Sequence, residues 1–367
     1  MKAYLIMDGQ WGSCGKGLLA GKLALDRNPD LVVCNFGPNA GHTFITPDQE
    51  RLVTRQLPTG LVADGALLLL GPGAIIDPAV LADEFDRLSG QYQIDRRLMI
   101  HERAAVVLPQ DRETEARLVA IASTRKGVGA ALARKILRES SREVPAIARD
   151  YFTGDLAEYV VDAKQYRELL FGANLVQIES AQGFELSLNH GSHYPYCTSR
   201  DVTPEAILND AGVPHRCLEE TAVVVRTYPI RVGNELDANG QVLGTSGPVY
   251  PDMQELSWQT LSRRAGQPLE ERTTVTGKIR RVFTWSDQQF LRMLESVAPA
   301  SILLNFANYL EPDALAYELL STRCKTFVRH VAELAARQGA KLTWLGFGPG
   351  YADVEAYGDA TSLRSAA

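Results

Sequence analysis

Residues 3–25 read AYLIMDGQWGSCGKGLLAGKLAL, and the order of their segments predicts a strand, a tight loop and a helix. Residues 3–7 form an apolar run suited to a buried strand, and residues 18–25 have helical periodicity. Glycines separate the two segments. A strand, a glycine-rich loop and a helix in this order direct backbone N–H groups and the positive end of the helix toward phosphate. Lys16, at the helix entrance, adds a mobile positive charge.

The loop differs from the common phosphate-binding pattern in one respect that matters for its interpretation. That pattern has a serine or threonine after the lysine, whereas here Gly17 follows Lys16. The loop is therefore a variant, and on its own it does not predict an ordinary ATPase.

Further apolar runs follow along the whole chain, and most of them end at a glycine or a polar cluster. The expected strands are residues 31–36, 66–70, 98–100, 105–108, 175–178, 222–225, 301–304 and 342–345, with a helix expected over residues 78–88. Continuous apolar strands separated by helices predict an α/β fold with a large, mainly parallel central sheet and helices on both faces. Because neither a repeat nor a linker interrupts the pattern, we expect residues 1–367 to form one domain with insertions.

Composition limits the classes of function. The chain has 367 residues, 45% of them hydrophobic and 22% charged, which is ordinary for a soluble globular protein. The formal net charge of −6 argues against non-specific binding to nucleic acid. Five cysteines without paired spacing predict reduced thiols in a cytoplasm, with Cys14 as a small space-filling side chain. No apolar segment is long enough to predict a signal peptide or a membrane span.

Several motifs together resemble the adenylosuccinate synthetase family. Members of that family open with Gln-Trp-Gly-Asp-Glu-Gly-Lys-Gly and later carry Asn-Ala-Gly-His-Thr. This chain has residues 10–12 and 15–17 of the first motif and all of the second, at residues 39–43. Other family-like segments follow in the expected order at residues 179–183, 194–199, 225–233, 273–281 and 348–350. The resemblance spans nearly the whole chain.

One departure from the family pattern points to a branch of the family. Ser13 and Cys14 replace the Asp-Glu pair, whose aspartate serves the family as catalytic base and metal ligand. A substitution here resembles the phage branch, the 2-aminoadenylosuccinate synthetases, which act on dGMP on the route to diaminopurine DNA. The resemblance implies a homodimeric, NTP-dependent C–N ligase of the host cytoplasm that uses Mg²⁺. It would join L-aspartate to C6 of dGMP through a 6-phosphoryl intermediate, with ATP or dATP as phosphate donor.

Two alternatives stay open. An ordinary adenylosuccinate synthetase that lost its aspartate would act on IMP. A catalytically inactive purine-nucleotide-binding homologue is the other reading, because the family base is missing, although Lys16, His42 and the arginine cluster are retained.

The resemblance also implies roles for individual residues. The catalytic set is Ser13, Lys16 and His42, and Ser13 with the Gly41 carbonyl would hold the metal. The residues expected around the NTP are Gly15, Lys16, Gly17, Gly41, His42, Thr43, Asn305, Phe306, Asn308, Gly348 and Pro349. Those expected around the purine monophosphate are Ser13, Asn39, Thr124, Arg138, Gln182 and Thr198, with Arg138 supplied by the neighbouring subunit. Those expected around L-aspartate are Thr273, Thr274, Thr276, Lys278 and Arg280, since a dicarboxylate needs cations and hydroxyls.

Two substitutions carry the substrate assignment. The Ser13 hydroxyl can accept a hydrogen bond from the 2-amino group of guanine, and it is smaller than a carboxylate. Asn308 replaces the aspartate with which the family reads the guanine of GTP, and an amide matches N1 and N6 of adenine. The plainer interpretations are that Asn308 caps a turn and that residues 273–281 form a solvated basic loop.

Overall fold

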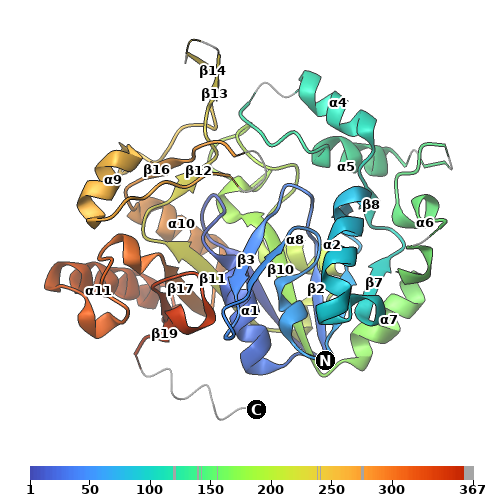
Figure 1. The fold of residues 1–367 in the computed structure, drawn as a ribbon, viewed down its shortest axis with the longest axis horizontal. Helices are drawn as coiled ribbons and strands as arrows, with labels where there is room; N and C mark the ends of the chain where they lie inside the picture. Colours follow the sequence, from blue (N-terminus) through green and yellow to red (C-terminus); the bar gives the residue numbers. More distant parts are fainter. Residues whose placement is uncertain are drawn as a thin grey trace.

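The computed structural model describes residues 1–118, 121–138, 140–141, 143–154, 156–237, 239, 241–273 and 277–358, and these residues build a ten-stranded central sheet (Figure 1). Along the sheet the strands are β19 (Val354–Ala356), β18 (Lys341–Gly346), β17 (Ser301–Asn305), β11 (Leu218–Arg226), β1 (Lys2–Asp8), β10 (Leu175–Gly183), β2 (Leu31–Cys34), β5 (Leu67–Leu70), β7 (Leu98–His101) and β9 (Val160–Val161). Neighbouring strands are parallel except β18 and β19. The predicted mainly parallel sheet is confirmed.

Helices cover both faces of this sheet. They are α1 (Lys16–Arg27), α2 (Pro78–Tyr92), α3 (Ile94–Arg97), α4 (Pro109–Leu118), α5 (Val128–Leu137), α6 (Ala148–Tyr151), α7 (Ala163–Gly172), α8 (Pro204–Ala211), α9 (Trp258–Ala265), α10 (Asp287–Val297) and α11 (Thr322–Arg337). Short 3₁₀ helices connect other elements: η1 (Thr59–Val62), η2 (Ala157–Tyr159), η3 (Phe184–Leu186), η4 (His215–Cys217), η5 (Ala307–Tyr309), η6 (Tyr317–Leu319) and η7 (Tyr351–Asp353). None of the described helices is both long and apolar enough to span a membrane.

The alternation of side chains along β1 explains why two hydrophobic cores flank the sheet. Tyr4 and Ile6 pack into one core with α1 and α2, whereas Leu5 and Met7 pack into the other with α7, α8, α10 and α11. Successive side chains of a strand point to opposite faces, so a strand covered on both faces must be apolar throughout. Burial of β1 on both faces explains the continuous apolar run at the start of the chain.

Smaller sheets lie beside the main one. They pair β3 (His42–Ile45) with β4 (Arg51–Thr54), β6 (Ile75–Ile76) with β8 (Ala105–Val106), β13 (Glu235–Leu236) with β14 (Val242–Gly244), and β12 (Ile230–Arg231) and β15 (Glu255–Leu256) with β16 (Arg281–Phe283). The expected strand at residues 105–108 is thus β8, and it is not part of the central sheet. Its backbone bonds go to the segment around β6: Ala105 N donates to Ala74 O and Val107 N to Ile76 O, each at 2.8 Å.

The carboxyl ends of β1, β2, β10, β11 and β17 share one edge of the sheet, because these strands are parallel neighbours. In open α/β sheets ligands bind at this edge. The loops that follow these strands are therefore where a site is expected.

Candidate active site

The loop between β1 and α1 leaves the first turn of the helix free for an anion. The N-cap residue of α1 is Gly15, and no side chain caps the helix. Gly15 has φ +98°, and a Cβ there would lie 2.1 Å from Nδ2 of Asn305, so only glycine fits. Uncapped N–H groups and the helix dipole together form a phosphate-binding end.

Gly17 explains why this loop lacks the usual serine or threonine after the lysine. A Cβ at Gly17 would lie 2.9 Å from Cβ of His42 and 3.0 Å from the Thr43 carbonyl oxygen. The start of α1 therefore packs directly against β3. This close approach brings Lys16 and His42 to the wall of one cavity.

A buried carboxylate, Asp8, organises the loop from beneath. It accepts hydrogen bonds from the backbone N–H groups of Gln10 at 3.0 Å and Cys14 at 2.9 Å. Its Oδ2 lies 3.5 Å from Nζ of Lys16, which also donates to the Gln182 carbonyl at 2.8 Å. Lys16 is thus held between the end of β1 and the end of β10.

Cys14 fills space in the loop. Its side chain is fully buried and its Sγ donates to Oε1 of Gln10 at 3.1 Å. Burial raises the pKa of the Cys14 thiol, which keeps the thiol protonated and unreactive.

A cavity of about 360 Å³ lies over the loop. Its wall combines the loop, β3, the segment before β16 and the end of β17, and its lining residues are Ser13, Gly15, Lys16, Gly17, Leu18, Gly41, His42, Thr43, Glu271, Arg272, Arg280, Asn305, Phe306, Asn308, Tyr309, Gly348 and Pro349. Every residue that the sequence analysis assigned to the NTP lines this cavity. We call it the loop cavity.

His42 is a neutral imidazole in the loop cavity at pH 7. Burial, together with the charge of Lys16, lowers the pKa of His42 to about 3. Its ring packs on Phe36 with the ring centroids 4.4 Å apart. Its Nδ1 atom is buried and has no hydrogen-bond partner among the described residues. A neutral ring of this kind can donate one hydrogen bond and accept another.

The end of the loop cavity beside β17 combines an aromatic ring with a free amide. The side-chain amide of Asn305 is engaged in hydrogen bonds within the protein: its Nδ2 donates to the Cys14 carbonyl at 2.9 Å and its Oδ1 accepts from Phe306 N at 2.8 Å. Phe306 has φ +62° and lines the cavity. The Oδ1 of Asn308 is buried without a hydrogen-bond partner among the described residues. An unpaired buried acceptor at a cavity wall is suited to a ligand donor.

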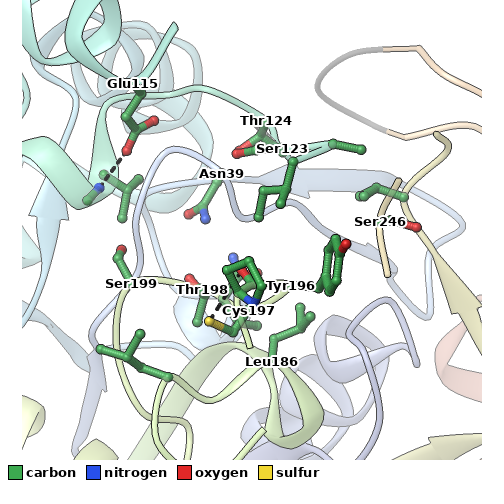
Figure 2. Close-up of a pocket in the computed structure, with 18 of the residues that line it drawn as sticks. Asn39, Glu115, Ser123, Thr124, Leu186, Tyr196, Cys197, Thr198, Ser199 and Ser246 are labelled. Carbon is green, nitrogen blue, oxygen red and sulfur yellow. Dashed lines mark hydrogen bonds between the residues drawn. The ribbon is translucent and has the colours of Figure 1, made fainter. Parts of the chain in front are cut away.

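A second cavity of about 650 Å³ also borders the loop, and we call it the Gln182 cavity (Figure 2). Trp11 of the loop lines it, together with Asn39, Thr124, Gln182 and Thr198. Figure 2 shows the side chains of Asn39, Thr124 and Thr198 around this space. Four of the six residues predicted for the purine monophosphate therefore share one cavity, which adjoins the loop that also borders the NTP set.

The N-terminus of α5 already holds a carboxylate at the edge of the Gln182 cavity. Glu115, labelled in Figure 2, accepts from Gly127 N at 2.7 Å and from Gly129 N at 2.6 Å. A helix N-terminus favours negative charge. The Glu115 carboxylate therefore already occupies the N-terminus of α5 at this end of the cavity.

The two remaining residues of the predicted monophosphate set lie elsewhere. Ser13 is exposed, has φ +58° and lines the loop cavity. It follows Trp11 by two residues, so the loop passes from one cavity to the other at this point. Arg138 directly follows α5, is exposed and lines neither cavity.

The predicted aspartate set is divided. Arg280 lines the loop cavity, whereas Lys278 lines neither cavity and lies 3.6 Å from Oε1 of Glu235. Thr273 is buried, and its Oγ1 accepts from Lys278 N at 3.0 Å, which closes the turn of this segment. Thr274 and Thr276 lie outside the described residues.

Sequence reasoning missed five residues around the two cavities, namely Asp8, Glu115, Arg226, Glu271 and Tyr309. A signal existed for two of them, since Asp8 and Arg226 are the polar residues that end β1 and β11. Polar residues at the carboxyl end of a parallel strand are candidates for a site by position alone. For Glu115, Glu271 and Tyr309 no comparable signal exists, because their partners are distant in sequence or are backbone groups.

Comparisons with known proteins find one family. The sequence model of the adenylosuccinate synthetase family matches residues 5–171 and 149–304. The N6-succino-2-amino-2'-deoxyadenylate synthase of Salmonella phage PMBT28 is 36% identical over 96% of this chain and 97% of its own length. The adenylosuccinate synthetase of Thermococcus onnurineus is 32% identical over 91% of this chain and 93% of its own.

A solved structure shares the fold along the entire chain. It is the succinoaminodeoxyadenylate synthetase of cyanophage S-2L, bound to dGMP and to dATP as an energy donor. It superimposes with a TM-score of 0.82 at 35% identity, covering 99% of this chain and 97% of that one.

Proposed function

The chain belongs to the adenylosuccinate synthetase family, and we propose that it joins L-aspartate to C6 of dGMP, with ATP or dATP as phosphate donor. The product is N6-succino-2-amino-2'-deoxyadenylate. The observation that carries this proposal is Ser13: an exposed hydroxyl lines the loop cavity where the family pattern has a carboxylate. The phage relative at 36% identity and the S-2L enzyme with bound dGMP support it.

The reaction has two steps. In the first, O6 of the base attacks the γ-phosphorus, the bond to the β-phosphate oxygen breaks, and the base loses its N1 proton. In the second, the neutral aspartate amine attacks C6, the C6–O6 bond breaks, the nitrogen loses one proton to water, and inorganic phosphate leaves. Phosphoryl transfer depends mainly on positioning and charge neutralisation.

Lys16 and His42 act on the first step. Lys16 lies at the uncapped start of α1 and carries the positive charge that the γ-phosphate needs. His42 is neutral, so it stabilises the charge that develops on O6 by donating a ring N–H. It does so without adding a second cation next to Lys16.

Ser13 selects the base. Its hydroxyl accepts a hydrogen bond from the 2-amino group, which IMP lacks. A serine hydroxyl is a poor base without an activating partner. Water therefore takes the N1 proton. The positive charge of Lys16 and the bond that forms between O6 and the γ-phosphorus both make N1 more acidic.

The donor set fits Mg²⁺. Magnesium is usually held by one or two protein oxygens together with substrate phosphates and water. Ser13 and Gly41, which offer a hydroxyl and a carbonyl oxygen, both line the loop cavity. When bound there, Mg²⁺ would neutralise charge on the phosphates.

The purine monophosphate occupies the Gln182 cavity, with its base reaching across the loop to Ser13 and His42, and the donor occupies the loop cavity. Asn308 reads adenine, because its unpaired Oδ1 can accept from N6 and its Nδ2 can donate to N1. Phe306 supplies a stacking surface. The dATP in the S-2L structure supports an adenine donor.

The protein acts as a homodimer in which Arg138 reaches the 5′-phosphate in the neighbouring subunit. Arg138 lines neither cavity of its own chain. The preceding side chains, Ile136 and Leu137, are 73% and 63% exposed. Large apolar side chains exposed next to an unassigned arginine are consistent with a subunit interface.

The test is a comparison of dGMP and IMP with L-aspartate, Mg²⁺ and ATP. We expect phosphate release with dGMP to exceed that with IMP by about tenfold or more in kcat/KM. Preference for IMP would make the protein an ordinary adenylosuccinate synthetase, and no phosphate release with either nucleotide would make it an inactive homologue.

A Ser13→Asp variant tests the role of the hydroxyl directly. We expect it to lower kcat/KM for dGMP and to raise that for IMP, because a carboxylate is the stronger base for N1. Ser296→Asp, at an exposed serine of α10, is the control for introducing a carboxylate. An unchanged ratio in Ser13→Asp would show that the 2-amino group is recognised by another residue.

A further inference from the structure

Arg226 is a fully buried arginine at the end of β11, between the parts of the site. Its side chain has 0% exposure. One guanidinium nitrogen donates to the Ser13 carbonyl at 3.0 Å and to Oε2 of Glu271 at 3.2 Å, and the other donates to Oε1 of Glu271. The guanidinium also lies over the Phe306 ring, with Cζ 3.8 Å from the ring centroid.

The backbone of Arg226 is tied to the same loop. Its N–H donates to Oε1 of Gln10 at 3.0 Å, and Nε2 of Gln10 donates back to its carbonyl at 3.3 Å. Gln10 thus binds the Arg226 backbone while Arg226 binds the Ser13 backbone. Arg226 therefore contacts three walls of the loop cavity, namely the loop after β1, the segment of Glu271 and the segment of Phe306.

Glu271 has a second cation beside it. The segments 271–273 and 277–280 run antiparallel: Arg272 pairs with Ile279, and Arg280 N donates to Glu271 O at 2.9 Å. Glu271 and Arg280 are therefore opposite each other, and side chains at such positions share one face. Both line the loop cavity.

Only one of the two cations is paired with Glu271. Arg226 takes both carboxylate oxygens, and Tyr309 OH adds a hydrogen bond at 2.9 Å. The Arg280 guanidinium donates to the Arg272 carbonyl at 3.4 Å and forms no ion pair with any described residue. Burial disfavours the charged form of Glu271, but the charge and hydrogen bonds of Arg226, with a smaller effect from the nearby charge of Arg280, outweigh it and lower the pKa of Glu271.

We propose that Arg226 is a positioning residue that occupies Glu271 and thereby keeps Arg280 free to bind a carboxylate of the amino-acid substrate. The proposal rests on the assignment of L-aspartate to this site. A carboxylate opposite an arginine would otherwise form an ion pair with it and compete with the substrate. The same contact fixes the plane of Phe306, on which the donor base stacks.

The test compares Arg226→Gln, Glu271→Gln and the double variant. In Arg226→Gln, Glu271 is released and pairs with Arg280, so the KM for L-aspartate should rise about tenfold or more. The KM for the purine monophosphate should rise less, because Arg226 contacts only the backbone carbonyl of Ser13. In the double variant the competing carboxylate is gone, so the KM for L-aspartate should return toward the wild-type value. Loss of packing alone would not be reversed by a second substitution.

Arg97→Gln is the matched control. Arg97 is also a buried arginine, but its guanidinium donates to the carbonyls of Leu61, Ala63, Ala66 and Tyr92, away from both cavities. Its loss should lower the melting temperature without changing the KM for L-aspartate. If Arg226→Gln does not fold, Arg226→Met replaces it, since a long apolar side chain fills the buried space but cannot pair with Glu271.

The outcomes separate this proposal from the proposed function. KM values are measured with whichever of dGMP and IMP the wild type uses, and binding of L-aspartate is measured by isothermal titration calorimetry in addition. Failure of dGMP alone rejects the nucleotide assignment and leaves the proposal standing. An unchanged affinity for L-aspartate in Arg226→Gln, or no recovery in the double variant, overturns the role of Arg226.

Discussion

Asn308 and Ser13 are the two residues whose free hydrogen-bonding groups distinguish this site from the family pattern. The amide oxygen of Asn308 is buried and unpaired among the described residues, and the Ser13 hydroxyl is exposed at the cavity wall. Neither is needed to hold the loop, which depends on Asp8, Gln10 and Asn305. Substrate choice and loop architecture are therefore carried by different residues.

An Asn308→Asp substitution should move the donor preference from ATP or dATP toward GTP. A carboxylate accepts from N1–H and the 2-amino group of guanine, whereas it meets an acceptor at N1 of adenine. An unmatched buried polar group costs about 1–3 kcal/mol, which corresponds to about tenfold in the ratio of kcat/KM values. The measurement is phosphate release with each donor at fixed dGMP and L-aspartate. An unchanged ratio would mean that Phe306 stacking alone holds the base.

His42 makes stability depend on pH in a defined direction. Its pKa is about 3 in the folded protein, below the ordinary value of 6.5. The unfolded chain therefore binds a proton at His42 before the folded protein does, so this contribution is present above pH 6.5 and is lost as pH falls toward 3. Between pH 7.5 and pH 5 the unfolding free energy of the wild type should fall by about 2 kcal/mol more than that of His42→Gln.

Urea denaturation at the two pH values measures this difference. His215→Gln, at an exposed histidine, is the control and should behave as the wild type does. Equal pH dependence in the wild type and His42→Gln would show that His42 is not buried in its neutral form.

At the scale of elements, the sequence predicted the parts of the fold that carry continuous apolar runs. The strands of the central sheet with four or more buried residues were all expected, since burial on both faces requires such runs. Two-residue strands such as β6 and β12 have too few residues to show a period. Likewise, the Arg226–Glu271 pair joins residues 45 positions apart, and no local pattern reports such a contact.

The packing of α1 against β3 predicts the effect of restoring the common loop residue. Gly17→Ser places a Cβ 2.9 Å from Cβ of His42. Overpacking of this kind costs about 1–3 kcal/mol, and displacement of His42 should also reduce kcat. Chemical denaturation and phosphate release measure the two effects.

Gly90→Ala, in α2, is the control for adding a methyl group to a helical glycine. Apart from its chain neighbours and the backbone of its own helix, no described atom lies within 4 Å of the added Cβ, so this change should stabilise the protein by about 0.5–1 kcal/mol. If Gly17→Ser retained wild-type stability and rate, close contact between α1 and β3 would not be the reason for glycine at this position.

At the scale of the whole molecule, one edge of the sheet supports both cavities, and the loop after β1 borders each of them. The residues around the loop cavity come from both halves of the chain. The order of motifs in the sequence predicted which residues line the loop cavity. It was less successful for the residues expected around L-aspartate, of which Lys278 lies outside that cavity. The reason is physical: the loop residues are fixed by backbone geometry, whereas Lys278 is exposed and its ion pair with Glu235 depends on tertiary context.

Subunit complementation tests whether the active unit is larger than one chain. Arg138→Ala and Lys16→Ala should each be nearly inactive, because one loses the phosphate contact and the other the charge on the γ-phosphate. When the two variants are mixed and allowed to exchange subunits, half of the dimers are mixed. Each mixed dimer has one site with Lys16 from one chain and Arg138 from the other, so activity should recover to about a quarter of the wild-type value. A mixture of Lys16→Ala and His42→Ala should not recover, since both residues serve the site of their own chain. If Arg138→Ala and Lys16→Ala also fail to complement, Arg138 does not act across a subunit boundary, and the monophosphate site must be completed from within one chain.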